Sequence, residues 1–350
     1  MLTPRTEQIL KSIIKWYIEH ASPVSSQVLV NDYDLGVSSA TVRSEMAFLE
    51  QEGYIIRPHT SAGSIPSDKG YRFYVGSLEE VALPVSEQRM ISHLFHQVEG
   101  RMDDWLSLAA AIISRISRNT AVITVPKPAD CQFRHMELVS IQDTMVLLVL
   151  VLRGARINQQ IFSTEAPVSQ TELSVISRKM NQDLVGLTSE QISAKDQELS
   201  GFEQQIKGYL IKIMQREDEQ GYNQSYLEGL HFMLNHPEFS HNERILDIME
   251  LLEHRTMLGS ILPQDRGNKH VTVVIGSENQ AEVAQDCSLV VSHYGLPSEA
   301  SGTIVVVGPT RMPYPRVISA VSYLSILLSG LVAELYGVSM FFPGKQDNTN

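Results

Sequence analysis

The length, composition and charge of the chain indicate a soluble protein of more than one domain. It has 350 residues, of which 43% are hydrophobic and 19% are charged, and its formal net charge at pH 7 is −12. This length exceeds that of one ordinary domain, and the hydrophobic fraction is enough to bury a normal core. The acidic balance argues against an overall attraction to polyanions, but it leaves room for a smaller segment of different charge.

No segment predicts a secretory signal, a membrane span or a disulfide framework. Lys11 and Lys15 interrupt the apolar stretches at the N-terminus, so no signal sequence is expected. The most apolar run, residues 144–152, is far too short to cross a bilayer and predicts a buried strand. Cys131 and Cys287 lie far apart in the sequence. We expect both to be small buried side chains in a reducing cytoplasm.

The first 76 residues predict three helices, a strand, a turn and a fourth helix. Cap residues, prolines and helical spacing of apolar side chains mark the elements. In chain order they are a helix from Thr3 and Pro4 to about residue 20, a short helix from Ser25, a third over 39–51 that stops at Gly53, a strand over 54–57, a turn over 58–66 and a helix from Ser67. This order is typical of a winged helix-turn-helix.

The remaining chain predicts an α+β sheet domain interrupted by a helical insertion. The expected elements are a long helix over 86–118, strands over 121–125, 133–141, 145–152 and 157–162, a helix over 171–187, a polar helix-rich region to about 262, strands over 271–275, 287–292 and 303–307, and a final helix over 315–336. The expected domains are 1–80, then a sheet domain in two parts (84–187 and 263–345) around an insertion over 188–262.

Short hydrogen-bonding side chains gather at the start of the predicted third helix. They are Ser38, Ser39, Thr41, Arg43 and Ser44, and they lie off the apolar face of that helix. A helix that enters a DNA major groove needs small polar residues and an arginine there, and its N-terminus favours a phosphate. The alternative is a capped surface helix without a ligand.

The turn and the helix after it carry residues suited to gripping a phosphate backbone. Cations and a histidine bracket a run of hydroxyl residues and glycine, which can approach and donate to phosphate oxygens. The candidate residues are Arg57, His59, Thr60, Ser61, Gly63, Ser64, Lys69 and Arg72. An ordinary hairpin turn is the alternative.

The charge of this segment requires that its acidic residues be segregated from any DNA-binding face. Residues 1–76 contain seven Lys and Arg against eight Asp and Glu. We therefore expect Glu45, Glu50 and Glu52 to point away from the helix face that meets DNA. We therefore expect one copy of this segment to bind DNA with moderate affinity. Two copies bound to the same DNA would compensate for the moderate affinity of each.

Seven short segments together resemble the HrcA family of heat-inducible transcription repressors. They are Ser-Ser-Ala-Thr-Val-Arg at 38–43, Met-Ala-Phe-Leu-Glu at 46–50, Pro-His-Thr-Ser-Ala-Gly at 58–63, Asp-Lys-Gly-Tyr-Arg at 68–72, Pro-Glu-Phe at 237–239, Ile-Gly-Ser-Glu at 275–278 and Gly-Pro-Thr-Arg-Met-Pro-Tyr at 308–314. They occur in family order from the N-terminus to about residue 336, so the resemblance covers nearly the whole chain.

The resemblance implies a dimeric repressor of chaperone genes. Members of the family bind an inverted-repeat operator called CIRCE. The resemblance therefore implies two partners for this chain: double-stranded operator DNA and a second copy of the chain. It also implies a GAF-like central domain split by an inserted dimerising domain, and activity maintained by the GroEL chaperonin.

Two positions depart from the family pattern. The family usually has arginine after the glycine of the turn and asparagine after the arginine of the third helix, where this chain has Ser64 and Ser44. A missing arginine removes one phosphate or minor-groove contact, and serine reads bases less specifically than asparagine. The exact operator sequence therefore stays open.

Three other functions compete with repression. An enzyme is disfavoured because the chain has no Gly-rich phosphate loop, nucleophile elbow or HExxH motif. A ligand- or metal-sensing regulator stays open, since His93 and His96 lie three residues apart and His236 and His241 flank Pro237, but no cysteine pair supplies a closed zinc site. An interaction protein without DNA function is the third. We expect no cofactor, no metal and no membrane partner, and a cytoplasmic location.

Overall fold

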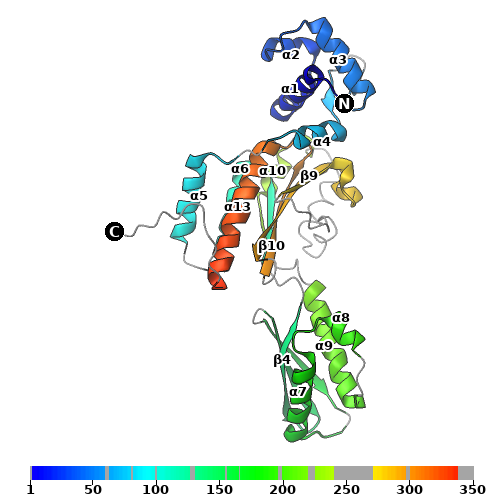
Figure 1. Cartoon of the computed structure of the whole chain (residues 1–350), viewed down its shortest axis with the longest axis vertical. Coiled ribbons are helices and arrows are strands. Elements are labelled where there is room, and N and C mark those ends of the chain that lie inside the picture. The colour runs from blue at the N-terminus through cyan, green and yellow to red at the C-terminus, as the bar shows by residue number, and fades with distance from the viewer. Residues whose placement is uncertain are drawn as a thin grey trace, which may run out of the picture. The chain divides into compact units, whose positions relative to one another are not determined.

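The computed structural model divides the chain into two compact units (Figure 1). The first comprises residues 1–125, 225–294 and 303–350, and the second comprises 126–224 and 295–302. The structure describes residues 2–59, 63–79, 82–98, 101–126, 131–153, 156–164, 166–195, 199–219, 225–239, 271–296 and 300–337. Both units contain helices packed with an antiparallel sheet, which confirms the expected α+β class.

The first three helices begin where their cap residues predict. They are α1 (Pro4–His20), α2 (Ser26–Asp32) and α3 (Ser39–Gln51). The hydroxyls of Thr3, Ser25 and Ser38 each accept a hydrogen bond from a backbone N–H in the first turn of the helix that follows, as N-caps do. Gly53, with a φ of +76°, follows α3 in the left-handed conformation that ends helices.

A short ribbon and a fourth helix complete the N-terminal module, by which we mean residues 2–79. Strands β1 (Ile55–Ile56) and β2 (Ile65–Pro66) pair antiparallel. Helix α4 (Asp68–Gly76) follows, with the Ser67 hydroxyl as its cap. The order of elements in this module therefore matches the sequence prediction.

The rest of the first unit is built around a five-stranded sheet with the order β7-β3-β10-β9-β8. The strands are β3 (Thr120–Thr124), β7 (Ser225–Glu228), β8 (Thr272–Ile275), β9 (Cys287–Leu296) and β10 (Ala300–Pro309). Strand β3 pairs antiparallel with β7 on one side and with β10 on the other. Every residue of β3 is buried, as expected for a central strand covered on both faces.

Helices α5 (Val85–Gln97), α6 (Met102–Ser117) and α13 (Tyr314–Leu335) belong to this sheet domain. The single long helix predicted over 86–118 is wrong: Val98 and Arg101 have extended backbone, and α6 starts anew with two aspartates in its first turn. Acidic side chains there favour a helix start because they interact with its positive dipole end. Figure 1 shows α13 beside α6 along the sheet.

Helix α13 is the one helix of the described residues that is long and apolar enough to cross a membrane by length and composition. Its buried residues include Val317, Ala320, Val321, Leu324 and Leu328, which join the core of the sheet domain. The hydroxyl of Tyr323 donates to the Gln88 carbonyl and bonds the Ser92 hydroxyl of α5. These contacts are those of a core helix.

The second unit packs three helices on a three-stranded antiparallel sheet of order β4-β5-β6. The strands are β4 (Phe133–Gln142), β5 (Met145–Leu152) and β6 (Arg156–Ser163), and the helices are α7 (Gln170–Leu184), α8 (Ser189–Ala194) and α9 (Gly201–Glu219). These three strands were expected in the sheet domain, with an insertion starting at 188. The unit starts instead at residue 126, because β4, β5 and β6 pair only with one another.

The two faces of this small sheet differ in how they are covered. One face buries Met136, Leu148 and Phe162 against α7 and α9. The other face, called here the open face, carries Val139, Leu147 and Ile161 in one register row, and Glu137, Val149 and Gln159 in the next. Ile161 is 50% exposed and Val139 42%. A sheet that is apolar on both faces, with one face left uncovered by the described residues, indicates an interaction surface.

The two cysteines have different surroundings. Cys287 is fully buried, and burial raises its thiol pKa to about 12, so the thiol stays protonated and behaves as a small apolar side chain. Cys131 is only half-buried, so the expectation of two buried thiols holds for Cys287 alone.

A partly buried polar cluster centred on Arg311 links the sheet domain to the N-terminal module. The guanidinium donates from Nε to Glu238 and from Nη1 to the Ile18 carbonyl at 3.2 Å. Ile18 lies in the last turn of α1, where carbonyls have no partner within the helix. Arg311 Nη2 also lies 3.2 Å from His236 Nδ1, and His236 Nε2 lies 3.1 Å from the Arg118 carbonyl. These contacts fit a neutral imidazole that accepts at Nδ1 and donates at Nε2.

This cluster predicts that the first unit loses stability in mild acid. Burial, aided by the charge of Arg311, lowers the pKa of His236, while the hydrogen bond to Arg118 and the charge of Glu238 oppose the shift. The unfolded chain therefore binds this proton at a higher pH than the folded chain does. The stabilisation is present above about pH 6.5 and is lost as the pH falls through the lowered folded-state pKa. Urea unfolding midpoints of the wild type should thus fall between about pH 7 and about pH 5.5.

The matched variant is His236→Gln, which keeps a donor for the Arg118 carbonyl but does not titrate. Its unfolding midpoint should change less than that of the wild type over the same pH range. Parallel pH curves for the two proteins would show that His236 is not the group responsible.

Candidate nucleic-acid interface

Helix α3 presents one continuous exposed stripe with little bulk. Val42, Met46 and Leu49 are buried in the module. The exposed residues on the rest of the helix are Ala40, Arg43, Ser44, Ala47, Phe48 and Gln51. Spacings of three and four residues place Ala40, Arg43, Ser44 and Ala47 on one side of the helix, so small side chains surround one arginine.

Arg43 is exposed, and none of the described residues forms a hydrogen bond or ion pair with it. A guanidinium in this state retains all five donors for an external acceptor. Ser44 beside it is also exposed. The predictions that Arg43 and Ser44 lie outside the core are therefore confirmed.

The hydroxyls at the start of α3 are partly used by the fold. Thr41 N–H donates to Ser38 Oγ at 3.2 Å, and Ser38 Oγ and Thr41 Oγ1 lie 3.0 Å apart. Ser39 Oγ lies 3.2 Å from Ser26 Oγ of α2. Ser38 and Thr41 thus organise the helix terminus, and Ser39 links α3 to α2. The backbone N–H groups of the first turn still provide a positive dipole end suited to a phosphate.

The two acidic residues within α3, Glu45 and Glu50, are both engaged by neighbouring side chains. Thr6 of α1 donates its hydroxyl to Glu45 Oε2 at 2.8 Å, which holds this carboxylate toward α1. Glu50 forms an ion pair with Arg57 at 3.0 Å. Glu50 lies seven residues after Arg43, on the same side of the helix, and its pairing with Arg57 compensates its charge. An otherwise acidic chain therefore has a locally non-repulsive surface for a polyanion.

Two of the residues predicted to contact the DNA phosphate backbone lie at the surface of the ribbon after α3. Arg57 and His59 are exposed directly after β1. The pairing of Arg57 with Glu50 is a surface contact, which costs little to exchange for a phosphate. Thr60 and Ser61 lie outside the described residues.

Ser64 has a structural position, which corrects its predicted role in DNA contact, while a close approach of DNA to the half-buried Gly63 stays a prediction. Ser64 pairs with Val24 through two backbone hydrogen bonds of 2.8 and 2.9 Å. A Cβ on Gly63 would lie 2.5 Å from the Val24 carbonyl oxygen, so the glycine serves this close approach. The Ser64 side chain is 1% exposed and is not available to DNA, so the expected loss of a contact at this position does not follow.

Lys69 lies at the opposite end of α3 from Ser38. Its ammonium donates to the Glu52 carbonyl at 2.6 Å and lies 4.3 Å from the centre of the Tyr54 ring. A cation at a helix C-terminus satisfies an unpaired carbonyl and complements the dipole. Lys69 is exposed, so a phosphate contact stays a prediction beside this structural role.

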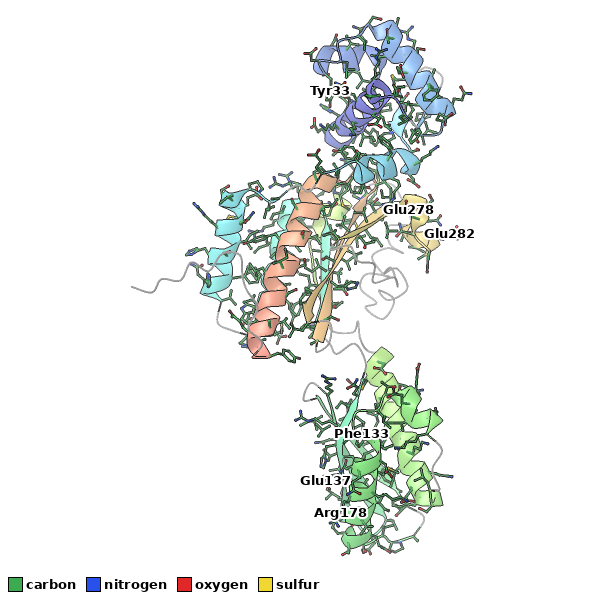
Figure 2. The ribbon with its side chains drawn as sticks, in the orientation of Figure 1. Tyr33, Phe133, Glu137, Arg178, Glu278 and Glu282 are labelled. Atoms are coloured by element: carbon green, nitrogen blue, oxygen red, sulfur yellow. The ribbon has the colours of Figure 1, made fainter. Side chains whose placement is uncertain are left out.

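Arg72 is not a free phosphate-binding group, which corrects its predicted role: its side chain is 42% exposed, but its guanidinium is bound within the chain. Its Nε donates to Glu278 Oε1 at 2.6 Å, its Nη2 to Glu278 Oε2, and its Nη2 also to the Val273 carbonyl at 2.7 Å. Figure 2 labels Glu278 on the short helix η3 (Gly276–Glu278) that follows β8. Arg72 therefore joins α4 to the sheet domain.

Three residues of the exposed α3 stripe were not identified from the sequence. Ala40, Ala47 and Gln51 share the side of the helix that carries Arg43. The signal was available in their helical spacing from Arg43 and in the small size that close approach to a groove requires. The alanines were missed because only polar side chains were considered as candidates for DNA contact.

The residues considered for metal sensing do not gather into a site within the described ranges. There, no group of three or more His, Cys, Asp and Glu side chains is placed to hold a metal ion. His93 contacts Gln97 of its own helix, and His236 belongs to the Arg311 cluster. His241 lies outside the described residues.

Comparison with known proteins places the chain in a family. The model of the HrcA protein C-terminal domain matches residues 103–318. The heat-inducible transcription repressor HrcA of Dehalococcoides mccartyi strain 195 is 50% identical over 347 residues, which cover 99% of this chain and 100% of that protein. The chain belongs to the HrcA family. The HrcA protein of Roseiflexus castenholzii is 40% identical, covering 96% of each chain.

This membership confirms the resemblance that the short segments carried. The HrcA family is a family of transcription repressors, so the expectation that the chain is not an enzyme is also confirmed. A solved crystal structure of a hypothetical protein at 2.2 Å resolution has a TM-score of 0.56 and 23% sequence identity, covering 95% of this chain and 98% of that one. At that identity the likeness concerns the fold alone.

Proposed function

We propose that this HrcA-family chain represses heat-shock genes by inserting α3 into the major groove of operator DNA. The observation that carries the proposal is the exposed stripe of α3, where Arg43 has free donors, its neighbours are small, and Glu45 is held against α1. A recognition helix requires this combination, because its first turns must approach base edges closely. The heat-inducible repressors that share up to 50% of the sequence support the same role.

The module in this proposal is a winged helix-turn-helix. Helices α2 and α3 form the helix-turn-helix, and the β1–β2 ribbon forms the wing, with Arg57 and His59 directed at the DNA backbone. The five-stranded sheet domain corresponds to the GAF-like domain that the family resemblance implies. Occupying the promoter would then prevent transcription without any chemical step.

The repressor is proposed to act as a homodimer that reads an inverted repeat of the CIRCE type. The open face of the β4-β5-β6 sheet is the proposed dimer contact, since no described segment covers its apolar residues. Two-fold symmetry of the protein would then match the symmetry of the operator. By family resemblance, the GroEL chaperonin maintains the active state, and the protein acts in the cytoplasm.

The test is the substitution Arg43→Ala, compared with Arg89→Ala. Arg89 is an exposed arginine of α5 in the sheet domain, with no ion pair among the described residues, so it controls for net charge. We expect Arg43→Ala to weaken binding by about tenfold to a hundredfold, because one arginine contact to a base is worth about 1–3 kcal/mol.

The measurement is an equilibrium binding titration at fixed salt. The DNA is the inverted repeat that a footprint locates upstream of the protein's own gene. The control variant Arg89→Ala should bind as the wild type does. Equal affinities of Arg43→Ala and wild type would reject α3 as the recognition helix.

A further inference from the structure

The N-terminal module is fastened to the sheet domain by two polar clusters at separate places. In the first, Asp68 Oδ2 accepts from the Ser277 N–H at 2.9 Å and from the Ser277 hydroxyl at 2.8 Å, while Arg72 binds Glu278 and the Val273 carbonyl. In the second, Arg311 binds the Ile18 carbonyl at the end of α1. The two clusters therefore hold α4 and α1 of the same module.

The first cluster is built closely enough to demand a glycine. Gly276 has a φ of +50°, and a Cβ at this position would lie well inside van der Waals contact with the Asp68 carboxylate. Glu278 also accepts a hydrogen bond from the Ile275 N–H at 2.9 Å. This contact orients the Glu278 carboxylate independently of Arg72. A carboxylate held in this way is a preorganised partner for a guanidinium.

Apolar packing continues across the same junction. Tyr71 of α4 and Tyr314 at the start of α13 are both buried, and their ring centres lie 6.0 Å apart. The buried residues of the module and of the sheet domain form one continuous hydrophobic cluster. The module is therefore packed on the sheet domain and does not depend on residues 77–84 alone for its attachment.

Four segments that carry the family resemblance meet at this junction, and the contacts that they make with one another lie apart from the exposed stripe of α3. Residues 68–72 bind residues 275–278, and Arg311 of the segment 308–314 binds Glu238 of the segment 237–239. Binding of DNA by α3 does not explain these contacts. Their common effect is to define the angle at which the module leaves the sheet domain.

We propose that Asp68, Arg72 and Arg311 are positioning residues for operator binding, which lock the module on the sheet domain so that the dimer accepts only one spacing of half-sites. The inference rests on the proposed function, because it concerns how two modules engage one DNA. Rigid attachment raises the effective concentration of the second module at its half-site when the spacing fits, and abolishes the gain when it does not.

This role differs measurably from the phosphate contact that the sequence suggests for Arg72. A residue that binds phosphate contributes to the affinity for a single half-site, and its loss reduces the salt dependence of binding by about one unit. A positioning residue leaves the half-site affinity and its salt dependence unchanged. It alters only the affinity for two half-sites and its dependence on their spacing.

The experiment uses the full-length chain as wild type, Arg72→Glu, Glu278→Arg and the double variant that exchanges the two charges. Three DNA duplexes are titrated: the footprinted inverted repeat, one half-site, and the repeat lengthened by about five base pairs, which is half a helical turn. Thermal unfolding verifies that each variant is folded. Glu278→Gln, which keeps the shape of the side chain, serves if a charge reversal prevents folding.

We expect Arg72→Glu to bind the half-site as the wild type does but to bind the native repeat about tenfold more weakly. We also expect it to lose less affinity than the wild type on the lengthened repeat, and the double variant to recover the wild-type pattern. Weakened half-site binding with a smaller salt slope, or wild-type behaviour on all three duplexes, would overturn the proposal. If the wild type bound none of the duplexes, the proposed function itself would fail, which is a separate result.

Discussion

In the proposed dimer, Ile161→Glu is expected to separate the two chains and to weaken operator binding by at least about a hundredfold. Ile161 lies on the open face of the second unit, opposite Leu147 and 50% exposed. A carboxylate at the centre of an apolar dimer contact would be buried without a partner, which is costly. In the monomer the same carboxylate stays in water, so the fold is retained.

The matched control is Val175→Glu. Val175 is 59% exposed on α7, which packs on the other face of the same sheet. The Val175→Glu substitution introduces the same charge as Ile161→Glu, at an exposed apolar position of the same unit. Sedimentation measures the oligomeric state, and titration of the footprinted repeat measures the affinity. A dimeric Ile161→Glu variant with wild-type affinity would remove the open face from the proposed interface.

Gly70→Ala is expected to destabilise the first unit by about 3 kcal/mol, the upper part of the usual range for overpacking. Gly70 is buried in α4, and a Cβ there would lie well inside van der Waals contact with the Tyr54 carbonyl oxygen. That oxygen belongs to the backbone at the start of the ribbon and has no alternative rotamer. Helix α4 would have to move, and it carries Tyr71 and Arg72 of the junction.

Gly76→Ala tests whether this loss comes from the contact rather than from alanine. Gly76 is the last residue of α4, and a Cβ there meets nothing within 4 Å. Alanine is the better helix former, so this variant should be as stable as the wild type or more stable by up to about 1 kcal/mol. Urea unfolding of the full chain compares the two. Equal stability of Gly70→Ala and Gly76→Ala would show that α4 and the ribbon adjust without cost.

The local elements of the module were accessible from the sequence because local chemistry determines them. The caps Thr3, Ser25 and Ser38 and the stop at Gly53 act within one helical turn, and the helices have the predicted bounds or nearly so. The exposure of Arg43 followed from the helical period of Val42, Met46 and Leu49. Such features require no knowledge of distant residues.

Features that depend on distant partners were not accessible in this way. The cations Arg43 and Arg72 look alike in the sequence, yet Arg43 has no partner among the described residues and Arg72 binds a carboxylate 206 residues away. The break between α5 and α6 was missed because the apolar period continues across it. The domain boundary was misplaced because the sequence of a strand does not specify the sheet that it joins. Strands β4, β5 and β6 were therefore assigned to the larger sheet, although they form a sheet of their own.

The sequence by itself determined the family, the α+β class and the exposed position of Arg43 on the third helix, because motifs, caps and periodicity depend on neighbouring residues. Only the tertiary structure decided which candidate residues face solvent: Ser64 is buried against Val24, and Arg72 is bound to Glu278. The physical reason is that burial and ion pairing depend on what the fold brings close, and a side chain's type does not specify its partner.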